Sequence, residues 1–126
     1  MVELATKTLL IVEDNVVTRE GLSTILSRQG YSIRGAADGR QAVEALRAEK
    51  PNLILLDMLL HGSGEDGWML LEKFRHNPEW RSIPVIIVTG IIVASEEWAI
   101  SLGARAVVRK PIDLDELLLK IQRHCL

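Results

Sequence analysis

Runs of hydrophobic residues recur along the chain and alternate with more polar segments. Four runs are apolar at every position, and a weaker one lies between the first and second of them; in chain order they are Leu9–Val12, Tyr31–Ala36 (the weaker run), Leu53–Leu56, Val85–Val88 and Ala106–Val108. A run that is apolar throughout is typical of a strand buried on both faces, as in a parallel sheet covered by helices. The pattern therefore predicts five strands.

Segments with helical periodicity separate these runs. The clearest lies near the end of the chain, where apolar residues recur at i, i+3, i+4 and i+7: Leu114, Leu117, Leu118 and Ile121. Shorter apolar faces are formed by Leu22, Ile25 and Leu26, by Val43 and Leu46, and by Leu70, Leu71 and Phe74. Residues typical of helix starts and stops stand at the edges, namely Asp38 and Asp113 (with Glu116) at starts and Gly30 and Gly103 at stops. Five alternating strand–helix units predict an α/β, doubly wound parallel sheet.

The composition adds limits on function. The 126 residues include 15 Lys and Arg against 17 Asp and Glu. The basic residues do not form the cluster that direct binding of nucleic acid requires. Cys125 is the only cysteine, so an internal disulfide is excluded. No apolar stretch approaches the roughly 18 residues that span a bilayer, and the start lacks a signal-peptide pattern. We expect one cytoplasmic domain over residues 1–126, with no membrane contact and no direct binding of nucleic acid.

Polar side chains follow four of the predicted strands. They are Glu13, Asp14, Asp57, Thr89 and Lys110. Ligands of open α/β sheets bind beyond the carboxyl ends of the strands, so these side chains are expected to share one edge. Three neighbouring carboxylates repel one another unless a cation is present, and Mg²⁺ prefers such oxygen ligands. The set permits phosphoryl transfer to Asp57, with Thr89 and Lys110 binding the phosphoryl oxygens.

A glycine pattern after Asp57 offers a different interpretation. Gly62, Gly64 and Gly67 match G-x-G-x-x-G, the fingerprint of dinucleotide-binding proteins. That fingerprint belongs to the first strand-to-helix turn, whereas this match lies in the third. No acidic residue follows at the distance needed to bind a ribose, and Glu65 and Asp66 would repel a pyrophosphate. We prefer a glycine-rich loop over the Asp57 site and keep a small nucleotide-binding protein as a rival hypothesis.

Four short motifs, in this order, resemble those of a known family. They are "LLIVEDN", "LILLDMLL", "VIIVTG" and "VVRKP". In this order and spacing they resemble the CheY-like receiver domain of two-component response regulators, over nearly the whole chain. The resemblance implies a flavodoxin-like (βα)5 three-layer sandwich with a parallel sheet in strand order 2-1-3-4-5.

The resemblance also implies roles for individual residues. Asp57 would be phosphorylated by a histidine kinase or a histidine phosphotransfer protein. The Mg²⁺ (or Mn²⁺) ligands would be Asp14, Asp57 and the backbone carbonyl of Leu59, with Glu13 acting mainly through water. Lys110, aimed by a cis bond to Pro111, would pair with the phosphoryl group, and Thr89 would swing toward it.

The chain departs from the family pattern at several positions. The loop after Asp57 is longer than usual. His61 occupies a position in this loop where the family commonly has proline. Because this position is close to Asp57 in the chain, His61 could contact the phosphoryl group. Val107 occupies a position that is often an aromatic switch residue. Leu59 and Ile91 are apolar where side chains flank the path of attacking water, so we expect slow self-dephosphorylation.

The predicted function is a phosphoacceptor switch in a two-component system or phosphorelay, not an enzyme acting on other substrates. Phosphorylation would change the surface that binds a downstream protein. The apolar segment "GIIVASEEW" with Val107 is either core or a partner surface. If it is a partner surface, the partner could be a second copy of the chain, bound through the fourth helix, fifth strand and fifth helix. The alternatives are a receiver acting alone or a module of a longer protein, and the rival function is a phosphorylation-independent docking module with a degenerate site.

Overall fold

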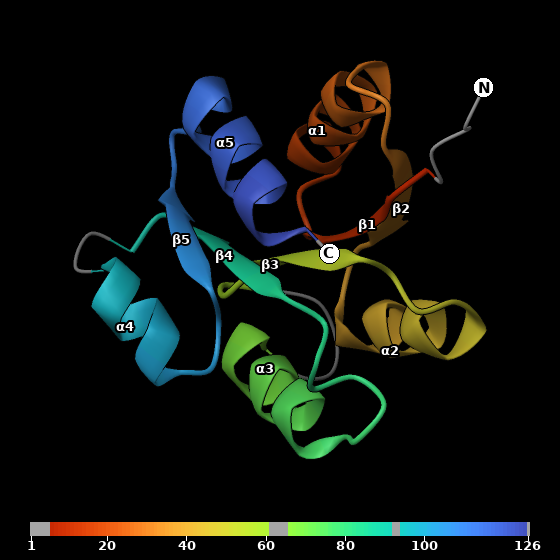
Figure 1. Ribbon diagram of the computed structural model, residues 1–126, viewed down its shortest axis with the longest axis vertical. Helices are drawn as coiled ribbons and strands as arrows, with labels where there is room; N and C mark the ends of the chain where they lie inside the picture. The colour runs from red at the N-terminus through yellow and green to blue at the C-terminus, as the bar shows by residue number, and fades with distance from the viewer. Residues whose placement is uncertain (1–5, 61–65, 92–93, 126) are drawn as a thin grey trace.

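The computed structural model describes residues 6–60, 66–91 and 94–125. Its centre is a parallel sheet in the order β2-β1-β3-β4-β5, which confirms the predicted topology (Figure 1). The strands are β1 (Thr8–Val12), β2 (Ser32–Ala36), β3 (Leu53–Asp57), β4 (Val85–Thr89) and β5 (Ala106–Arg109). Each predicted apolar run forms one strand, within a residue or so at its ends.

Helices cover both faces of the sheet and make three layers (Figure 1). One face carries α1 (Val16–Arg28) and α5 (Leu114–His124), and the other carries α2 (Gly39–Ala48), α3 (Gly67–His76) and α4 (Glu96–Ser101). The buried side chains accordingly form two clusters, one on each side of the sheet. Alternate residues of each strand face opposite clusters, which is why the central strands are apolar at every position.

Strand β1 illustrates this division. Leu10 and Val12 belong to the cluster under α2 and α3, whereas Leu9 and Ile11 belong to the cluster under α1 and α5. Strand β2 lies at an edge of the sheet, and of its residues only Ala36 is fully buried. Its low burial explains why its hydrophobic run is the weakest in the sequence, whereas β5, at the other edge, is buried from Ala106 to Val108.

The helix ends follow the predicted signals. Asp38 caps α2 by accepting a hydrogen bond from the Gln41 amide at 2.9 Å, and Asp113 caps α5 through the Glu116 amide at 3.2 Å. Gly30 and Gly103 follow α1 and α4 with φ of 98° and 95°. This left-handed conformation disfavours residues with a Cβ, so glycine ends both helices.

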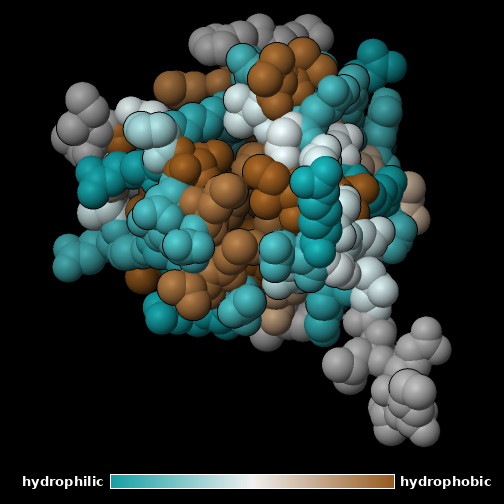
Figure 2. All heavy atoms as spheres, turned by 90° about the horizontal axis from the view of Figure 1, so that it is seen from above, coloured by the Kyte–Doolittle hydropathy of each residue, from teal (hydrophilic) through white to brown (hydrophobic). Residues whose placement is uncertain are grey.

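The face formed by α1 and α5 is not uniformly polar. Figure 2 shows hydrophobic side chains gathered in the middle of this face, with polar ones around them. Exposed apolar residues of these two helices are Val16, Val17, Leu114 and Leu119. Among the described residues, no helix is long and apolar enough to cross a membrane.

Candidate functional site

Four neighbouring strands deliver the five candidate residues to the carboxyl edge of the sheet. Val12 of β1 pairs with Leu56 of β3, so Glu13 follows its strand beside Asp57. On the other side, Thr89 of β4 pairs with Arg109 of β5, which Lys110 follows directly. The strand order alone therefore gathers these side chains, as parallel strands end at the same edge.

The three acidic residues form a cluster. Each of Glu13, Asp14 and Asp57 offers an oxygen within 4.8 Å of those of the other two. Glu13 and Asp57 are 3% and 5% exposed, whereas Asp14 is half-buried. They line an open cleft of about 380 Å³ together with Asn15, Thr18, Leu59, Gly90 and Lys110. Buried carboxylates require a nearby positive charge, and the cleft leaves room for a small cation and a phosphoryl group.

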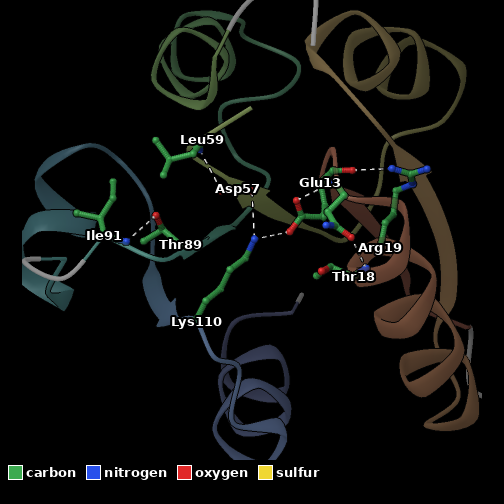
Figure 3. A network of polar contacts seen from close by, with 9 residues as sticks. Glu13, Thr18, Arg19, Asp57, Leu59, Thr89, Ile91 and Lys110 are labelled. Carbon is green, nitrogen blue, oxygen red and sulfur yellow. Dashed lines mark hydrogen bonds and ion pairs between the residues drawn. The ribbon is translucent and has the colours of Figure 1, made fainter. Parts of the chain in front are cut away.

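Lys110 supplies positive charge to the cluster. Its Nζ lies 2.5 Å from Glu13 Oε1 and 3.2 Å from Asp57 Oδ2, and Figure 3 shows it pointing between the two carboxylates. β5 lies two strands from β3, roughly 10 Å at the usual strand spacing. Lysine has a side chain long enough to bring its ammonium to β3. The peptide bond between Lys110 and Pro111 is cis, as the family resemblance implies.

Backbone amides orient the two buried carboxylates. The Leu59 amide donates to Asp57 Oδ1 at 3.0 Å, and the Asn15 amide donates to Glu13 Oε2 at 3.3 Å. Asp57 Oδ2 meets Lys110 instead. Both oxygens of Asp57 therefore have positively polarised partners, which hold the carboxylate facing the cleft.

Burial and charge shift the pKa values at this site. Burial raises the pKa of Glu13 above 4.5; Lys110 opposes this effect and Asp57 adds to it. Burial lowers the pKa of Lys110, but its hydrogen bond to Glu13 and the charges of Asp57 and Glu13 outweigh that, so this pKa lies above 10.5. Lys110 is therefore an ammonium at neutral pH, as binding of phosphoryl oxygens requires.

Thr89 lies on the other side of Asp57 from Glu13 in the view of Figure 3. It is fully buried, and its Oγ1 accepts a hydrogen bond from the Ile91 amide at 3.3 Å. Val107 and Ala94 are buried in the core and Ile91 packs against it, so the described part of the apolar segment "GIIVASEEW" with Val107 contributes mainly to the core. Ile100, in contrast, is 60% exposed.

The glycine pattern after Asp57 has a packing role at the one glycine that the structure describes. A Cβ on Gly67 would lie 2.4 Å from Met58 Cα and 2.6 Å from the Asp57 carbonyl oxygen. Glycine is needed there because the start of α3 approaches the end of β3 closely. His61, Gly62 and Gly64 lie outside the described residues.

Sequence reasoning missed three contacts between elements, one of them at the cleft. Arg19 of α1 donates to the Glu13 carbonyl oxygen at 2.7 Å. Glu96 and Lys120 form an ion pair at 2.5 Å beside β5, and the rings of Trp68 and Trp98 meet edge to face, with centroids 6.1 Å apart. Each contact joins residues on different elements, and no local pattern in the sequence indicates it.

Comparison with known proteins gives a consistent result. The family model described as the response regulator receiver domain matches residues 9–122. The chain is 34% identical over 121 residues to sporulation initiation phosphotransferase F of Bacillus subtilis, covering 92% of this chain and 91% of that protein. A crystal structure of a putative response regulator from Chloroflexus aurantiacus superposes with a TM-score of 0.86 at 30% identity, covering 96% of this chain and 98% of the other.

Other relatives are longer than this chain. It is 34% identical to the probable transcriptional regulator ycf27 of Cyanophora paradoxa, over 95% of this chain but 48% of that protein. The chain thus spans about half the length of this relative. Because relatives include a transcriptional regulator, the expectation that the protein does not bind nucleic acid is not supported.

Proposed function

The chain belongs to the response regulator receiver domain family, and from that premise we propose that Asp57 is its phosphoacceptor. Receiver domains are the phosphoacceptors of two-component signalling, and phosphorylation-dependent switching is their general function. The observation that carries the assignment is the position of Asp57: it ends β3, is 5% exposed, lines the cleft and meets Lys110 at 3.2 Å. In this proposal residues 1–126 form a single receiver domain.

The acidic cluster fits a hard divalent cation, Mg²⁺ or Mn²⁺. Three carboxylates within 4.8 Å offer the oxygen ligands such ions prefer. Burial already disfavours the charge of Glu13, and an added cation would offset that cost. In the proposal Asp14, Asp57 and the Leu59 carbonyl hold the cation, and Glu13 acts mainly through water. When bound, the cation would spread the negative charge of the transferring phosphoryl oxygens.

The reaction proposed is transfer of one phosphoryl group from a phosphohistidine of a histidine kinase or phosphotransfer protein. A carboxylate oxygen of Asp57 forms the new O–P bond while the P–N bond of the donor breaks, and the imidazole keeps that electron pair. The Lys110 ammonium is positioned to pair with the phosphoryl oxygens. In later hydrolysis, water attacks the phosphorus, the bond between phosphorus and the Asp57 oxygen breaks, and inorganic phosphate leaves as the carboxylate is regenerated.

The switch proposed connects this site with the α4–β5–α5 side of the molecule. Thr89 would turn its hydroxyl toward the phosphoryl group, releasing the Ile91 amide that it now accepts from at 3.3 Å. Ile91 leads toward α4, so this change would alter a surface that includes the exposed Ile100 and Leu119. The partner there would be a downstream protein or a second copy of the chain.

Incubation with acetyl phosphate and Mg²⁺, followed by intact mass measurement, tests the proposal. We expect the mass of one phosphoryl group to be added, to be absent after chelation of the cation, and to be lost in Asp57→Asn. Asp115→Asn is the matched control, because Asp115 is an exposed carboxylate in the first turn of α5. Unmodified wild-type protein, or Asp57→Asn that still gains the group, would overturn the assignment, and the first result would favour the degenerate docking module.

A further inference from the structure

Arg19 holds the backbone at Glu13 from outside the cleft, and we propose that it is a positioning residue for cation binding. The inference rests on the proposed function, because it concerns the same cation. In this proposal Arg19 contacts neither the cation nor the phosphoryl group. It fixes the peptide between Glu13 and Asp14, so that both carboxylates face the cleft before the cation arrives.

The Glu13 backbone is held at both of its polar groups. Its N–H donates to the Ala36 carbonyl of β2 at 3.0 Å, and its C=O accepts from the Arg19 guanidinium at 2.7 Å. Figure 3 shows the Arg19 side chain reaching from α1 back to this carbonyl. Because the Glu13 carbonyl belongs to the peptide plane that leads into Asp14, fixing it also limits the directions Asp14 can take.

Gly35 of β2 provides the space for this arrangement. A Cβ at Gly35 would lie 3.2 Å from Arg19 Cδ and 3.5 Å from both Cγ and Nε. The Arg19 stem therefore lies directly over the backbone of β2. The glycine in β2 is explained by this close approach, and it gives a second position from which the guanidinium can be displaced.

Arg19 and Lys110 have different roles in this arrangement. Lys110 contacts the side-chain oxygens of Glu13 and Asp57 and offsets part of their negative charge. Arg19 contacts a backbone oxygen, so its removal leaves the ligand set and the Lys110 charge in place. What is lost is orientation, and groups that orient metal ligands typically contribute about tenfold or more to metal affinity.

Titration calorimetry with Mg²⁺ alone tests the inference on the folded wild-type chain and on three variants of it. We expect Arg19→Met, which keeps most of the stem but removes the guanidinium, to bind Mg²⁺ about tenfold more weakly. Arg19→Lys, which retains a donor and a charge, should recover part of that loss. Arg28→Met is the matched control, since Arg28 is an exposed arginine on the same helix.

A purely structural role predicts a different result. It would lower the urea midpoint of Arg19→Met without changing the Mg²⁺ affinity of the folded fraction, and that outcome overturns the inference. If Arg19→Met does not fold, Gly35→Val decides: its Cβ already lies 3.2 Å from Arg19 Cδ, and its two further methyl groups should displace the Arg19 stem and weaken Mg²⁺ binding. Unchanged affinity overturns the inference. Wild-type protein that binds no Mg²⁺ would instead remove the proposed function on which the inference rests.

Discussion

The Lys110 ammonium lies closer to Glu13 than to Asp57, at 2.5 Å against 3.2 Å. The Lys110 side chain is 30% exposed, whereas that of Glu13 is 4% exposed. Lys110 thus shares its charge between two buried carboxylates from different strands, and it reaches the more distant strand with its shorter contact. The Lys110 ammonium therefore connects the ends of three strands, β1, β3 and β5.

Lys110→Met should destabilise the fold, because it leaves Glu13 and Asp57 buried without a counter-ion. We expect a loss of about 2 kcal/mol at neutral pH, less than the 3–5 kcal/mol typical of a fully buried pair because Lys110 is partly solvated. Added Mg²⁺ should restore more stability to this variant than to the wild type, since it replaces the missing charge. Urea unfolding with and without Mg²⁺ measures both effects; equal stability without Mg²⁺ would contradict the prediction.

Leu59 and Ile91 should make the phosphorylated protein long-lived. Leu59 is 46% exposed and lines the cleft, while Ile91 follows Thr89 and packs against the core. Neither side chain can hydrogen-bond an attacking water molecule. Leu59→Asn and Ile91→Glu should therefore lose the phosphoryl group several-fold faster, measured by intact mass after removal of acetyl phosphate.

Met69→Gln serves as the control for these two variants, because Met69 is 56% exposed on α3 and does not line the cleft. The hypothesis is wrong if the phosphorylated wild type has a half-life no longer than those of phosphorylated Leu59→Asn and Ile91→Glu.

Gly67→Ala should destabilise the protein, whereas Gly21→Ala should not. The new methyl at Gly67 would overlap the Met58 backbone at 2.4 Å, so the start of α3 must move away from the end of β3. We expect a loss of about 1–3 kcal/mol in the free energy of unfolding. At Gly21, within α1, nothing lies within 4 Å of the new Cβ, so alanine should add up to about 1 kcal/mol by helix propensity. Urea unfolding of the pair decides, and equal effects would refute the packing explanation.

Glu96 should protect the edge of the sheet at β5. Its Oε2 accepts from the Val107 amide at 3.2 Å, while Lys120 donates to the Val107 carbonyl at 2.7 Å. Both backbone groups of Val107 are thus satisfied by side chains that also pair with each other. Glu96→Ala should speed hydrogen exchange at the Val107 amide and cost about 1–2 kcal/mol.

Glu97→Ala is the matched control for Glu96→Ala, because Glu97 lies in the same first turn of α4 and is exposed. The same helix-dipole effect acts on both glutamates. Equal exchange at Val107 in the two variants would show that the edge contact contributes nothing beyond that effect.

The architecture, and the strand end at which each candidate residue lies, could be predicted from the amino-acid pattern. Runs such as Leu53–Leu56 are apolar throughout because they are covered on both faces, and this requirement is visible at every position of the run. Asp57 and Thr89 could be identified because each directly follows such a run, and Lys110 because only Arg109 separates it from one. A polar residue at the carboxyl end of a buried parallel strand has its location fixed by the fold class.

Which side chains contact one another became visible only in the packed molecule. That Lys110 lies nearest Glu13, that Arg19 holds the Glu13 carbonyl and that Gly35 leaves room for it all depend on the strand order and on how α1 packs over β2. Hydrophobic periodicity records only whether a position faces core or solvent, since that is what burial free energy acts on. Contacts between residues far apart in the chain depend on distances of a few ångströms between elements, and these distances are set when the whole molecule packs.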